Sequence, residues 1–361
     1  MLPMDSDTDL TASIAERVRA AAATGQTLRI RGGGSKDFYG QALQGDLLDM
    51  RAFAGVLSYE PSELVVTVRA GTPLAELQAL LASQGQCLPF EPPHFGPHAT
   101  VGGMVASGLN GPARGSVGAV RDYVLGVTLV NGKGEVLTFG GQVMKNVAGY
   151  DVSRLMAGSL GTLALLLDVS LKVLPVAPAE STLLFEMTED QARHQLNRWG
   201  GLPLPINASC WQAGHLAVRL RGAKAAVAAA RVTMGGELAD STADVLWAGL
   251  REQTLPFFEL QAGEALWRVS LPDTAAALDF GATLVEWGGA QRWLKRPASE
   301  ALSIRQAAAQ ASGHATLFRS ADKSVPVFTP LSAPLARIHH ALKQQFDPAG
   351  VFNPGRLSAD W

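Results

Sequence analysis

Cysteine, net charge and long apolar runs are all scarce in this sequence of 361 residues. Its two cysteines, Cys87 and Cys210, are too few for an iron–sulfur cluster or a cysteine-rich zinc site. They could pair with each other, although two buried thiols are the simpler interpretation. With 30 basic and 32 acidic residues, the chain has no excess of positive charge for nucleic acid or anionic lipid. We therefore expect no nucleic-acid partner.

Membrane and export signals are also missing. The apolar run at residues 163–167 ends at Asp168, far short of a membrane span, so we expect no transmembrane segment. Residues 1–5 include an acidic Asp5 and no basic region ahead of an apolar one, so we expect no secretory signal. Together these absences predict a cytoplasmic protein.

The sequence does contain enough apolar material for more than one core. Apolar residues make up 47% and charged residues 17%, a composition typical of globular rather than disordered chains. The length predicts two domains. Glycine is abundant, at 38 residues, and shows no collagen-like repeat, which indicates turns and close backbone contacts.

The first part of the sequence predicts a mixture of helices and strands. The predicted elements are a helix at 6–24, strands at 27–30 and 64–68, a hairpin of strands at 124–130 and 135–139, and a strand at 163–174. Thr72 is expected to cap a further helix that begins at Pro73. Residues 88–121 are rich in glycine and proline and lack sustained periodicity, which predicts a long functional loop without regular structure.

After Pro178 the composition changes, and all tryptophans lie at or beyond Trp199. Strands at 183–187 and 216–220 alternate here with helices at 190–199 and 223–234. This pattern predicts a second, smaller α+β domain.

A final amphipathic helix is predicted at 332–346. Its apolar stripe consists of Leu335, Ile338, Leu342 and Phe346. The predicted domains are therefore 1–178 and 179–325, followed by a C-terminal helix and tail at 326–361.

The strongest local signal is the run Arg31-Gly32-Gly33-Gly34-Ser35-Lys36, which directly follows a predicted strand. Consecutive glycines expose successive backbone N–H groups with no Cβ in the way, and Arg31 and Lys36 add positive charge. That combination suits an anionic diphosphate. The spacing of a dinucleotide fingerprint or of a Walker loop is absent. A triple glycine alone also fits a plain tight turn.

Two further glycine-rich segments follow in the same half. Residues 100–111 are mainly small, so an extended ligand could lie against their backbone, and Thr100 and Ser107 add polar groups. Residues 145–151, with the sequence Lys-Asn-Val-Ala-Gly-Tyr-Asp, precede another glycine-rich turn at 158–162. Residues 100–111 also fit a glycine-rich loop packed under a sheet, and each segment is ambiguous alone. The informative feature is the order in which all of them occur.

This order of motifs resembles the FAD-binding domain of the vanillyl-alcohol-oxidase (PCMH-type) superfamily over roughly residues 8–178. The motifs that carry the resemblance are residues 31–36, Glu91-Pro92, Ala99-Thr100-Val101-Gly102-Gly103, Gly149-Tyr150-Asp151 and Gly158-Ser159-Leu160-Gly161-Thr162. The implied fold class is α+β, with a PCMH-type FAD-binding domain of two subdomains and a smaller α+β cap domain.

The C-terminal tail and one internal segment resemble one branch of this superfamily in particular. Residues 346–357, which include Asn353-Pro354-Gly355-Arg356, are similar to the tail by which the glycolate/D-lactate dehydrogenase branch returns to its flavin domain. Residues 144–151 and the short length are most similar to the FAD-binding subunits of glycolate oxidases.

The cofactor implied by the resemblance is FAD. Its implied binding residues are Arg31, Gly32, Gly33, Gly34, Ser35, Lys36, Glu91, Pro92, Thr100, Val101, Gly102, Gly103, Ala106, Ser107, Gly108, Gly111, Ser159, Gly161, Thr162 and Asn353. Some relatives attach FAD through a histidine near the first loop, but no histidine precedes Phe90 in this chain, so we expect non-covalent binding. His94 and His98 could be flavin neighbours or plain loop residues.

This sequence differs from the catalytic members of that branch at positions that serve catalysis. Leu160 stands where catalytic members have an acid. Residues 312–319 keep only His314 of a Gly-His-Ala-Gly-Asp-Gly-Asn-Leu-His motif, whose imidazoles serve a metal and a 2-hydroxyacid in those members. His339 and His340 are expected on the exposed part of a helix, where adjacent side chains point apart. We therefore expect no metal site.

Arg268 and His314 are the remaining catalytic candidates. Arg268 could face the flavin or a substrate carboxylate, because a guanidinium suits both an anionic flavin and a carboxylate. A surface arginine at a strand edge is the alternative. His314 alone does not complete a general-base or metal site.

The resemblance implies an FAD-dependent oxidoreductase acting on CH–OH donors. It would be the FAD-binding subunit of a glycolate (2-hydroxyacid) dehydrogenase or oxidase complex that forms glyoxylate. The implied partners are a larger FAD-containing catalytic subunit and an iron–sulfur subunit, which could also hold the chain at the inner membrane. Two alternatives stay open: a self-sufficient FAD-dependent D-2-hydroxyacid (D-lactate) dehydrogenase, and a non-catalytic scaffold subunit.

Overall fold

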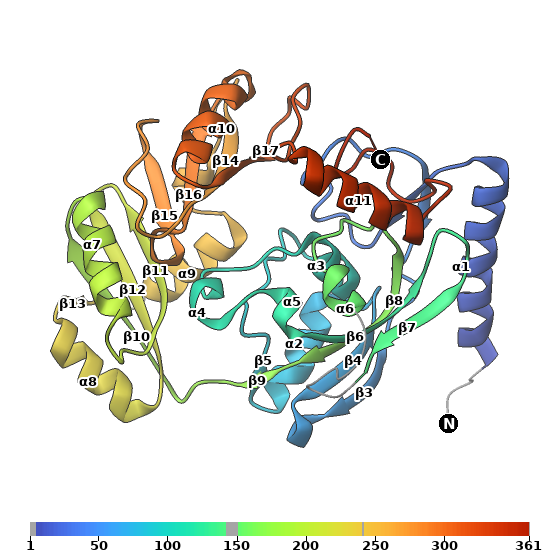
Figure 1. Ribbon diagram of the computed structural model, residues 1–361. Coiled ribbons are helices and arrows are strands. Elements are labelled where there is room, and N and C mark those ends of the chain that lie inside the picture. The colour runs from blue at the N-terminus through green and yellow to red at the C-terminus, as the bar shows by residue number, and fades with distance from the viewer. Residues whose placement is uncertain (1–4, 142–150, 240–241, 361) are drawn as a thin grey trace.

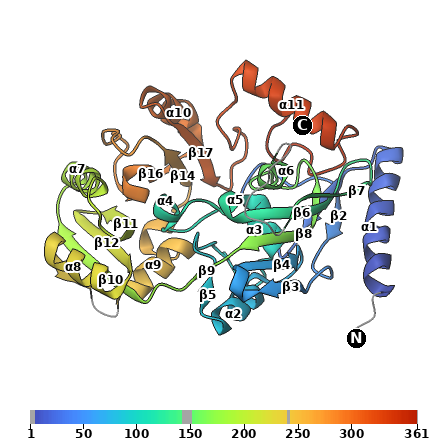
Figure 2. The same ribbon diagram turned by 60° about the horizontal axis from the view of Figure 1, so that its bottom comes forward.

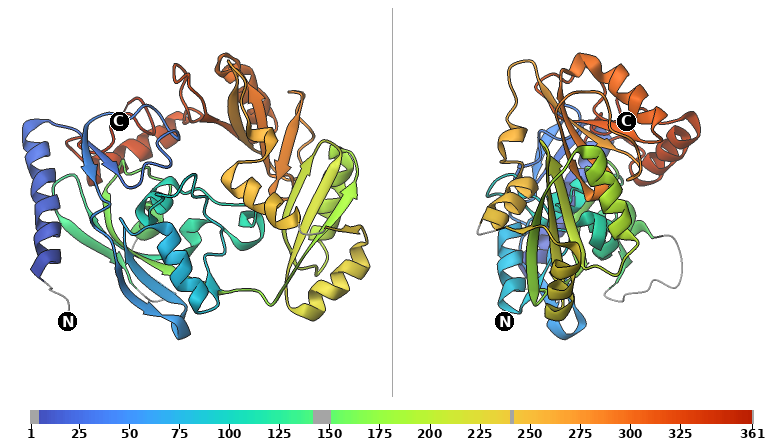
Figure 3. Two further views of the ribbon diagram at one scale, coloured as in Figure 1. Left: turned by 180° about the vertical axis from the view of Figure 1, so that it is seen from behind. Right: turned by 90° about the vertical axis from the view of Figure 1, so that its left-hand side faces the viewer.

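Two large β-sheets divide the chain into two halves that lie side by side (Figure 1). The computed structural model describes residues 5–141, 151–239 and 242–360. The predicted motif at residues 144–150 lies outside these residues. The first half runs from α1 (Asp5–Thr24) to β9 (Leu174–Pro175), and the second from β10 (Ala179–Glu186) to β17 (His314–Arg319), as Figure 3 shows from behind and from the side. We propose the domain boundary at the link between β9 and β10.

The first half is built on an antiparallel five-stranded sheet of order β3-β4-β8-β6-β7. Its strands are β3 (Val56–Glu60), β4 (Val65–Arg69), β8 (Leu165–Lys172), β6 (Val124–Val130) and β7 (Val136–Gly140). The central strand β8 is buried on both faces, which explains its apolar run. The fully buried Leu74, Leu77 and Leu81 of α2 (Leu74–Ser83) pack in the same core. The predicted hairpin is β6 and β7.

The N-terminal helix and the C-terminal tail meet at a small parallel pair, β1 (Leu28–Arg31) and β2 (Asp46–Asp49). The predicted N-terminal helix is confirmed, and its residues Ile14, Val18 and Ala21 are buried there. Phe352 forms a bridge with Leu28, and the tail therefore runs beside β1. This arrangement brings the end of the chain to the loop that follows β1.

The segment at 88–121 is not the irregular loop that we predicted. It contains three short helices, α3 (Val101–Ser107), α4 (Arg114–Val117) and α5 (Val120–Tyr123). Gly102 lies so close to Ala70 that a Cβ on it would come within 2.7 Å of the alanine Cβ. Close packing therefore requires glycine at this position. Because glycine usually indicates a turn, no helix was predicted here. Minor elements nearby are η1 (Pro61–Glu63), β5 (Gln86–Cys87) and α6 (Val152–Leu155).

The predicted capping role of Thr72 is also wrong. α2 begins without a side-chain cap, and the Thr72 hydroxyl donates instead to the carbonyl oxygen of Gly55 at 3.1 Å. Thr72 is fully buried, so its hydroxyl needs a partner inside the core and finds it in the neighbouring loop.

The second half is built on an antiparallel eight-stranded sheet of order β13-β10-β12-β11-β15-β16-β14-β17. Its further strands are β11 (Ile206–Gln212), β12 (His215–Gly222), β13 (Glu237–Leu238), β14 (Ala265–Ser270), β15 (Thr283–Glu286) and β16 (Gln291–Arg296). The helices are α7 (Glu189–Gly200), α8 (Lys224–Met234), α9 (Thr242–Glu252) and α10 (Ala301–Gln310), with the 3-10 turns η2 (Pro256–Phe258), η3 (Trp287–Gly289) and η4 (Ala298–Glu300). The predicted alternation of strands and helices is confirmed for β10, α7, β12 and α8.

The last helix, α11 (Ala333–Phe346), forms where we predicted it and lies over the first half (Figure 1). Its apolar stripe is only partly covered, because Leu335 is 48% exposed and Ile338 is 56% exposed. The predicted helix is thus present, and the apolar stripe of its first turns is largely exposed. Across the described ranges 5–141, 151–239 and 242–360, no helix combines the length and apolar character that a membrane span requires.

Charged and polar contacts join the two halves around residues 91–95. Glu91 accepts hydrogen bonds from Arg219 of β12 at 2.7 Å and from Arg221 at 3.1 Å. The Glu252 carboxylate at the end of α9 accepts hydrogen bonds from the amides of His94 and Phe95. Figure 2 shows α4 and α9 at this junction. The second half is thus held against the segment that leads into α3.

Candidate functional site

The loop after β1 presents a row of unpaired backbone amides. The N–H groups of residues 32–36 donate to no acceptor within the part of the chain that the structure describes. Successive free amides in a turn form a concave site for an anion, because their partial positive charges point the same way. Residues 32–36 are only half-buried, so these amides are available to a ligand.

Glycine is required in this loop because a second segment approaches its backbone. A Cβ on Gly33 would lie 1.4 Å from the carbonyl oxygen of His98, and one on Gly32 would lie 2.2 Å from Oγ1 of Thr100. Gly34 adopts a positive φ of 74°. The glycines therefore let the loop pack directly against residues 98–100, in addition to leaving the amides accessible.

Positive charges surround the loop. Lys36 donates to the carbonyl oxygen of His94 at 3.2 Å, and burial lowers the pKa of Lys36 to about 8. Arg356 of the tail donates to the carbonyl oxygens of Gln41 and Asp37, and burial lowers its pKa to about 10. Burial, followed by the charge of Arg356, lowers the pKa of Lys323 to about 8. Buried cations with lowered pKa values are short of negative charge, which a diphosphate would supply.

The loop forms a wall of two adjoining cavities, which share Thr100, Gly103, Ala106, Leu160 and Asn353 in their linings. The residues predicted to bind the cofactor that line either cavity are Arg31, Gly32, Gly33, Gly34, Ser35, Lys36, Thr100, Gly102, Gly103, Ala106, Ser107, Ser159, Gly161 and Asn353. The structure thus brings together the first loop, the start of α3, the turn before β8 and the tail, although they are far apart in the sequence.

Several predicted residues lie outside these cavities. They are Glu91, Pro92, Val101, Gly108, Gly111 and Thr162. Glu91 is committed to its ion pairs with Arg219 and Arg221. Gly108 ends α3 with a φ of 63°, and Thr162 donates its hydroxyl to the carbonyl oxygen of Ser159 at 2.8 Å. In the structure Glu91, Gly108 and Thr162 therefore support the fold around the cavities.

Sequence reasoning missed other lining residues. They are Ile30, Asp37, Leu43, Met50, Ala70, Leu160, Ala164, Leu166 and Arg356. Most are apolar and carry no signal of their own. Arg356 was visible in the motif Asn353-Pro354-Gly355-Arg356, from which we assigned only Asn353.

Asn353 fixes the tail between two walls of the site. Its side-chain oxygen accepts from the amide of Ile30 at 2.8 Å, and its side-chain nitrogen donates to the carbonyl oxygen of Leu160 at 2.6 Å. Leu160 itself has a positive φ of 51°, which is uncommon for a leucine and marks a backbone position under constraint. The tail therefore connects the backbone of β1 to the turn that contains Leu160, and both line the cavities.

Arg268, the predicted cation, lies at the contact between the halves rather than at a solvent-facing strand edge. It donates to the Tyr39 hydroxyl at 2.9 Å, and its guanidinium lies over the rings of Tyr39 and Phe318. In the described part of the chain it makes no ion pair with a carboxylate. An unpaired guanidinium at this junction is suited to an anionic ligand.

His314 shares a sheet face with Arg268. It pairs in register with Ser270 on β14, two residues from Arg268, so both side chains stand on the same side of the sheet. Partial burial, followed by the charge of Arg268, lowers the pKa of His314. Among the described residues, no group of three or more His, Cys, Asp and Glu side chains could hold a metal ion.

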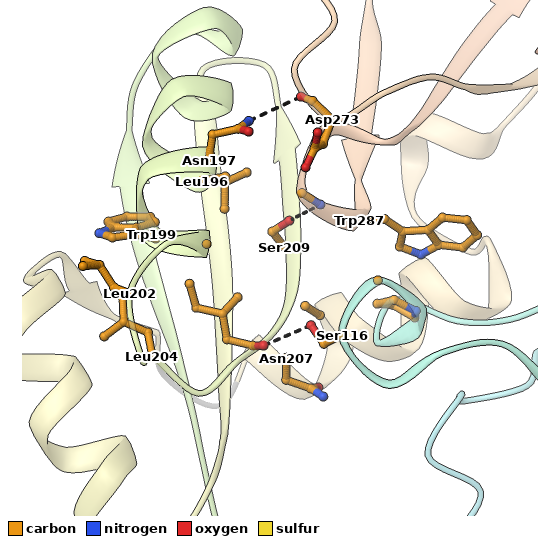
Figure 4. Close-up of a pocket in the computed structure, with 16 residues that line it drawn as sticks. Ser116, Leu196, Asn197, Trp199, Leu202, Leu204, Asn207, Ser209, Asp273 and Trp287 are labelled. Atoms are coloured by element: carbon orange, nitrogen blue, oxygen red, sulfur yellow. Dashed lines mark hydrogen bonds between the residues drawn. The ribbon is translucent and has the colours of Figure 1, made fainter. Parts of the chain in front are cut away.

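A separate cavity of about 510 Å³ lies between α7, β11 and η3 (Figure 4). It contains none of the predicted site residues. Its polar walls bond to each other, from Asn197 to the carbonyl oxygen of Asp273 and from Ser116 to that of Ile206. We therefore assign no ligand to it.

Comparisons with known proteins agree with this geometry. Residues 9–140 match the family described as FAD binding domain. The chain is 48% identical over 353 residues to the glycolate oxidase subunit GlcE of Escherichia coli (strain K12), covering 98% of both chains. It is 32% identical over 129 residues to the glycolate oxidase subunit GlcD of Bacillus subtilis (strain 168), covering 36% of this chain and 27% of that relative.

A solved structure of alkyldihydroxyacetonephosphate synthase is similar in fold. The TM-score is 0.65 at 16% sequence identity, and the match covers 94% of this chain and 74% of the other. At that identity the likeness concerns the fold alone. The predicted α+β fold of PCMH type is confirmed.

Proposed function

This chain belongs to the family of the glycolate oxidase subunit GlcE, within the PCMH-type FAD-binding proteins, and from this we propose that it is the FAD-binding subunit of a glycolate-oxidising complex. The reaction would oxidise glycolate, or a closely related 2-hydroxyacid, to the 2-oxoacid. The observation that carries the proposal is the row of free amides at residues 32–36, beside buried cations, in a chain so similar to GlcE.

The residues present fit FAD, the cofactor of this family. The amides of residues 32–36 would hold the diphosphate, and Lys36 and Arg356 would balance its charge. The apolar lining from Met50, Ala70 and Leu166 suits the uncharged parts of the molecule. When bound, FAD would supply the acceptor of the reducing equivalents. Binding is proposed to be non-covalent.

Partner subunits follow from what this chain lacks. Cys210 is buried and Cys87 is half-buried, and neither is part of a metal-ligating group in the described residues. An iron–sulfur relay would therefore lie on another chain. We propose a larger FAD-containing catalytic subunit and an iron–sulfur subunit as partners, in a cytoplasmic complex that reaches the inner membrane through them. The names of the similar GlcE and GlcD proteins support such an assembly.

A self-sufficient D-2-hydroxyacid dehydrogenase is the second candidate. The observation in its favour is the unpaired guanidinium of Arg268 between the halves, which could anchor a carboxylate without a partner chain. Binding of a carboxylate alone does not give turnover, since catalysis also needs groups that act in the transition state.

The proposal can be tested by replacement of a subunit. This chain would be expressed in Escherichia coli K12 lacking its own GlcE, and glycolate-dependent dye reduction would be measured in extracts. We expect restored activity with this chain and none with an empty vector. The proposal fails if the FAD-loaded chain assembles with the remaining subunits and glycolate is still not oxidised.

A further inference from the structure

A small cavity lies where the sheet of the second half faces residues 93–112 of the first half. Its polar lining from the sheet consists of Arg268, Glu286 and Gln291, and Phe318 and Trp293 form apolar walls. It is distinct from the two cavities of the triple-glycine loop, with which it shares no lining residue. Neither Glu286 nor Gln291 was a sequence-based candidate.

Strand register places these polar groups on one face. Gln291 of β16 lies opposite Glu286 of β15 on one side and opposite Ser270 of β14 on the other. Arg268 lies opposite Trp293, two residues from Gln291, so it is the diagonal neighbour of Gln291 across the β14–β16 pair. Diagonal neighbours are roughly 7–8 Å apart. A ligand of a few atoms could therefore contact both side chains.

Gln291 has an unsatisfied acceptor. Its side chain is 3% exposed, and its side-chain nitrogen donates to Oε2 of Glu286 at 3.1 Å. The same Glu286 oxygen also accepts from the Trp293 indole at 2.7 Å. The Glu286 carboxylate thus fixes the orientation of the amide, and Oε1 of Gln291 has no hydrogen-bond partner within the described residues. A buried acceptor without a partner calls for a donor from a ligand.

Arg268 supplies the complementary charge. Its hydrogen bond to the neutral hydroxyl of Tyr39 leaves its positive charge without a carboxylate partner in the part of the chain described. Packing over the Tyr39 and Phe318 rings holds the guanidinium at the cavity. A planar guanidinium binds a carboxylate through two parallel hydrogen bonds.

We propose that Arg268 and Gln291 form a binding subsite for a small 2-hydroxycarboxylate, an inference that rests on the proposed function. Arg268 binds the carboxylate of the ligand. Oε1 of Gln291 accepts the hydrogen bond of the ligand hydroxyl. Glu286 is a positioning residue that keeps Oε1 available. The subsite therefore recognises both functional groups of a 2-hydroxyacid and discriminates against a carboxylate without a hydroxyl.

The FAD-loaded full-length chain provides the first test, with no substitution needed. Isothermal titration calorimetry would compare glycolate with acetate, which has the carboxylate but no hydroxyl. We expect glycolate to bind roughly two- to tenfold more tightly, the range of one hydrogen bond. Equal affinities, or no binding of glycolate, would overturn the assignment.

Two variants then separate the roles. Arg268→Met should weaken both ligands by roughly 10- to 100-fold, because a charge-assisted contact is lost. Gln291→Met should lower the affinity for glycolate to that for acetate and leave acetate unchanged. Arg121→Met removes an arginine whose side chain is 67% exposed, and it should bind both ligands like the wild type. A Gln291→Met protein that folds and still prefers glycolate would contradict the role of Gln291.

The measured FAD content of the purified chain distinguishes a failure of this inference from a failure of the proposed function on which it rests. If the purified chain holds no FAD, the proposed function fails. If it holds FAD but does not distinguish glycolate from acetate, only the subsite fails. Should either variant not fold, the comparison of the two ligands on the wild-type chain still decides.

Discussion

At the scale of single residues, the titration of Lys36 gives the cofactor site a pH dependence. Burial lowers the pKa of Lys36 to about 8, and a bound diphosphate would raise it again by its negative charge. At and above pH 8, binding of FAD should then take up a proton. The affinity for FAD should be full below pH 8 and fall above it, by at most about tenfold per pH unit for one proton.

Fluorescence titration of the apoprotein with FAD between pH 7 and 9 would measure this dependence. Lys36→Arg keeps the charge at this position throughout the range, so its affinity should fall less steeply than that of the wild type, leaving only the contribution of Lys323, whose pKa is also about 8. A fall of the same size in Lys36→Arg would show that another group is responsible.

Gly33 gives a second prediction at this scale. A methyl group on Gly33 would collide with the His98 carbonyl oxygen, so the loop would have to move, at a cost of about 1–3 kcal/mol. Gly33→Ala should therefore purify with several-fold less FAD, measured by flavin absorbance per protein. Gly200→Ala is the matched control, because a Cβ there meets nothing within 4 Å. Normal FAD content in Gly33→Ala would contradict the role of the loop.

Glu286 predicts how the proposed carboxylate subsite responds to pH. Burial raises the pKa of Glu286 to about 7, and Glu91 adds to this effect. Arg268 and Arg251 also line the cavity, and the neighbouring Cys210 has a raised pKa and is neutral. Below pH 7 the Glu286 side chain is neutral and tolerates an anionic ligand. Above pH 7 it becomes negative and repels that ligand.

The affinity of the FAD-loaded chain for acetate should therefore decrease as the pH rises through 7. Calorimetry between pH 6 and 8 would detect this, and Glu286→Gln, which cannot ionise, should bind acetate with the same affinity across the range. Acetate is the probe because its binding depends on the charges in the cavity and not on the hydrogen bond to Gln291. A pH-independent wild type would rule out a carboxyl that titrates in this cavity.

At the scale of elements, contacts of α11 and the tail fix one side of the cofactor site. Lys343 is 5% exposed and donates to Asp347 Oδ2 and to the Thr162 carbonyl oxygen, both at 2.7 Å. Asp347 in turn accepts from the amides of Val351 and Phe352. This buried network sets the path of the chain toward Asn353 and Arg356.

Lys343→Met should lower the free energy of unfolding by about 3–5 kcal/mol, because it leaves Asp347 buried without its cation. Urea denaturation would measure the change. Arg51→Met breaks an exposed pair with Asp49 and should cost less than about 1 kcal/mol. Equal stabilities of the two variants would show that the buried pair does not hold the tail.

The elements also show which features the sequence could predict. Helix α1, the β6–β7 hairpin and the alternation in the second half follow from periodicity and turn residues, which act locally. Helix α3 was missed because glycine usually indicates a turn. Its glycines are needed for close packing on Ala70 and Thr100, which only the folded chain reveals. The sequence also predicted the apolar stripe of α11, but the exposure of Leu335 and Ile338 on that stripe is visible only in the structure.

The candidate site divides in the same way. The triple glycine and Asn353 carry recognisable patterns, whereas Gln291 and Glu286 meet only through the register of β15 and β16. Nothing in their local sequence marks them as lining a cavity. Contacts between strands depend on the whole sheet, so such residues need the structure.

At the scale of the whole molecule, the two halves divide the work. The first half, with the tail, holds the free amides and the cations around them, and the second half presents Arg268 and Gln291 from its sheet. No group of three or more potential metal ligands occurs in the described residues. The catalytic relatives, by resemblance, use several imidazoles, of which this chain keeps His314. We therefore expect a subunit that binds FAD and a carboxylate but relies on its partners for turnover.

The most direct measurement is anaerobic mixing of the FAD-loaded chain with excess glycolate, alone and within the assembled complex, while flavin absorbance is followed. A positioned proton acceptor is worth about 10²–10⁴-fold in rate, so a chain that relies on its partners for this group should differ clearly from the complex. We predict that the flavin of the complex is bleached by glycolate and that the isolated chain keeps its absorbance. Bleaching of the isolated chain within seconds would contradict this account and establish a self-sufficient dehydrogenase.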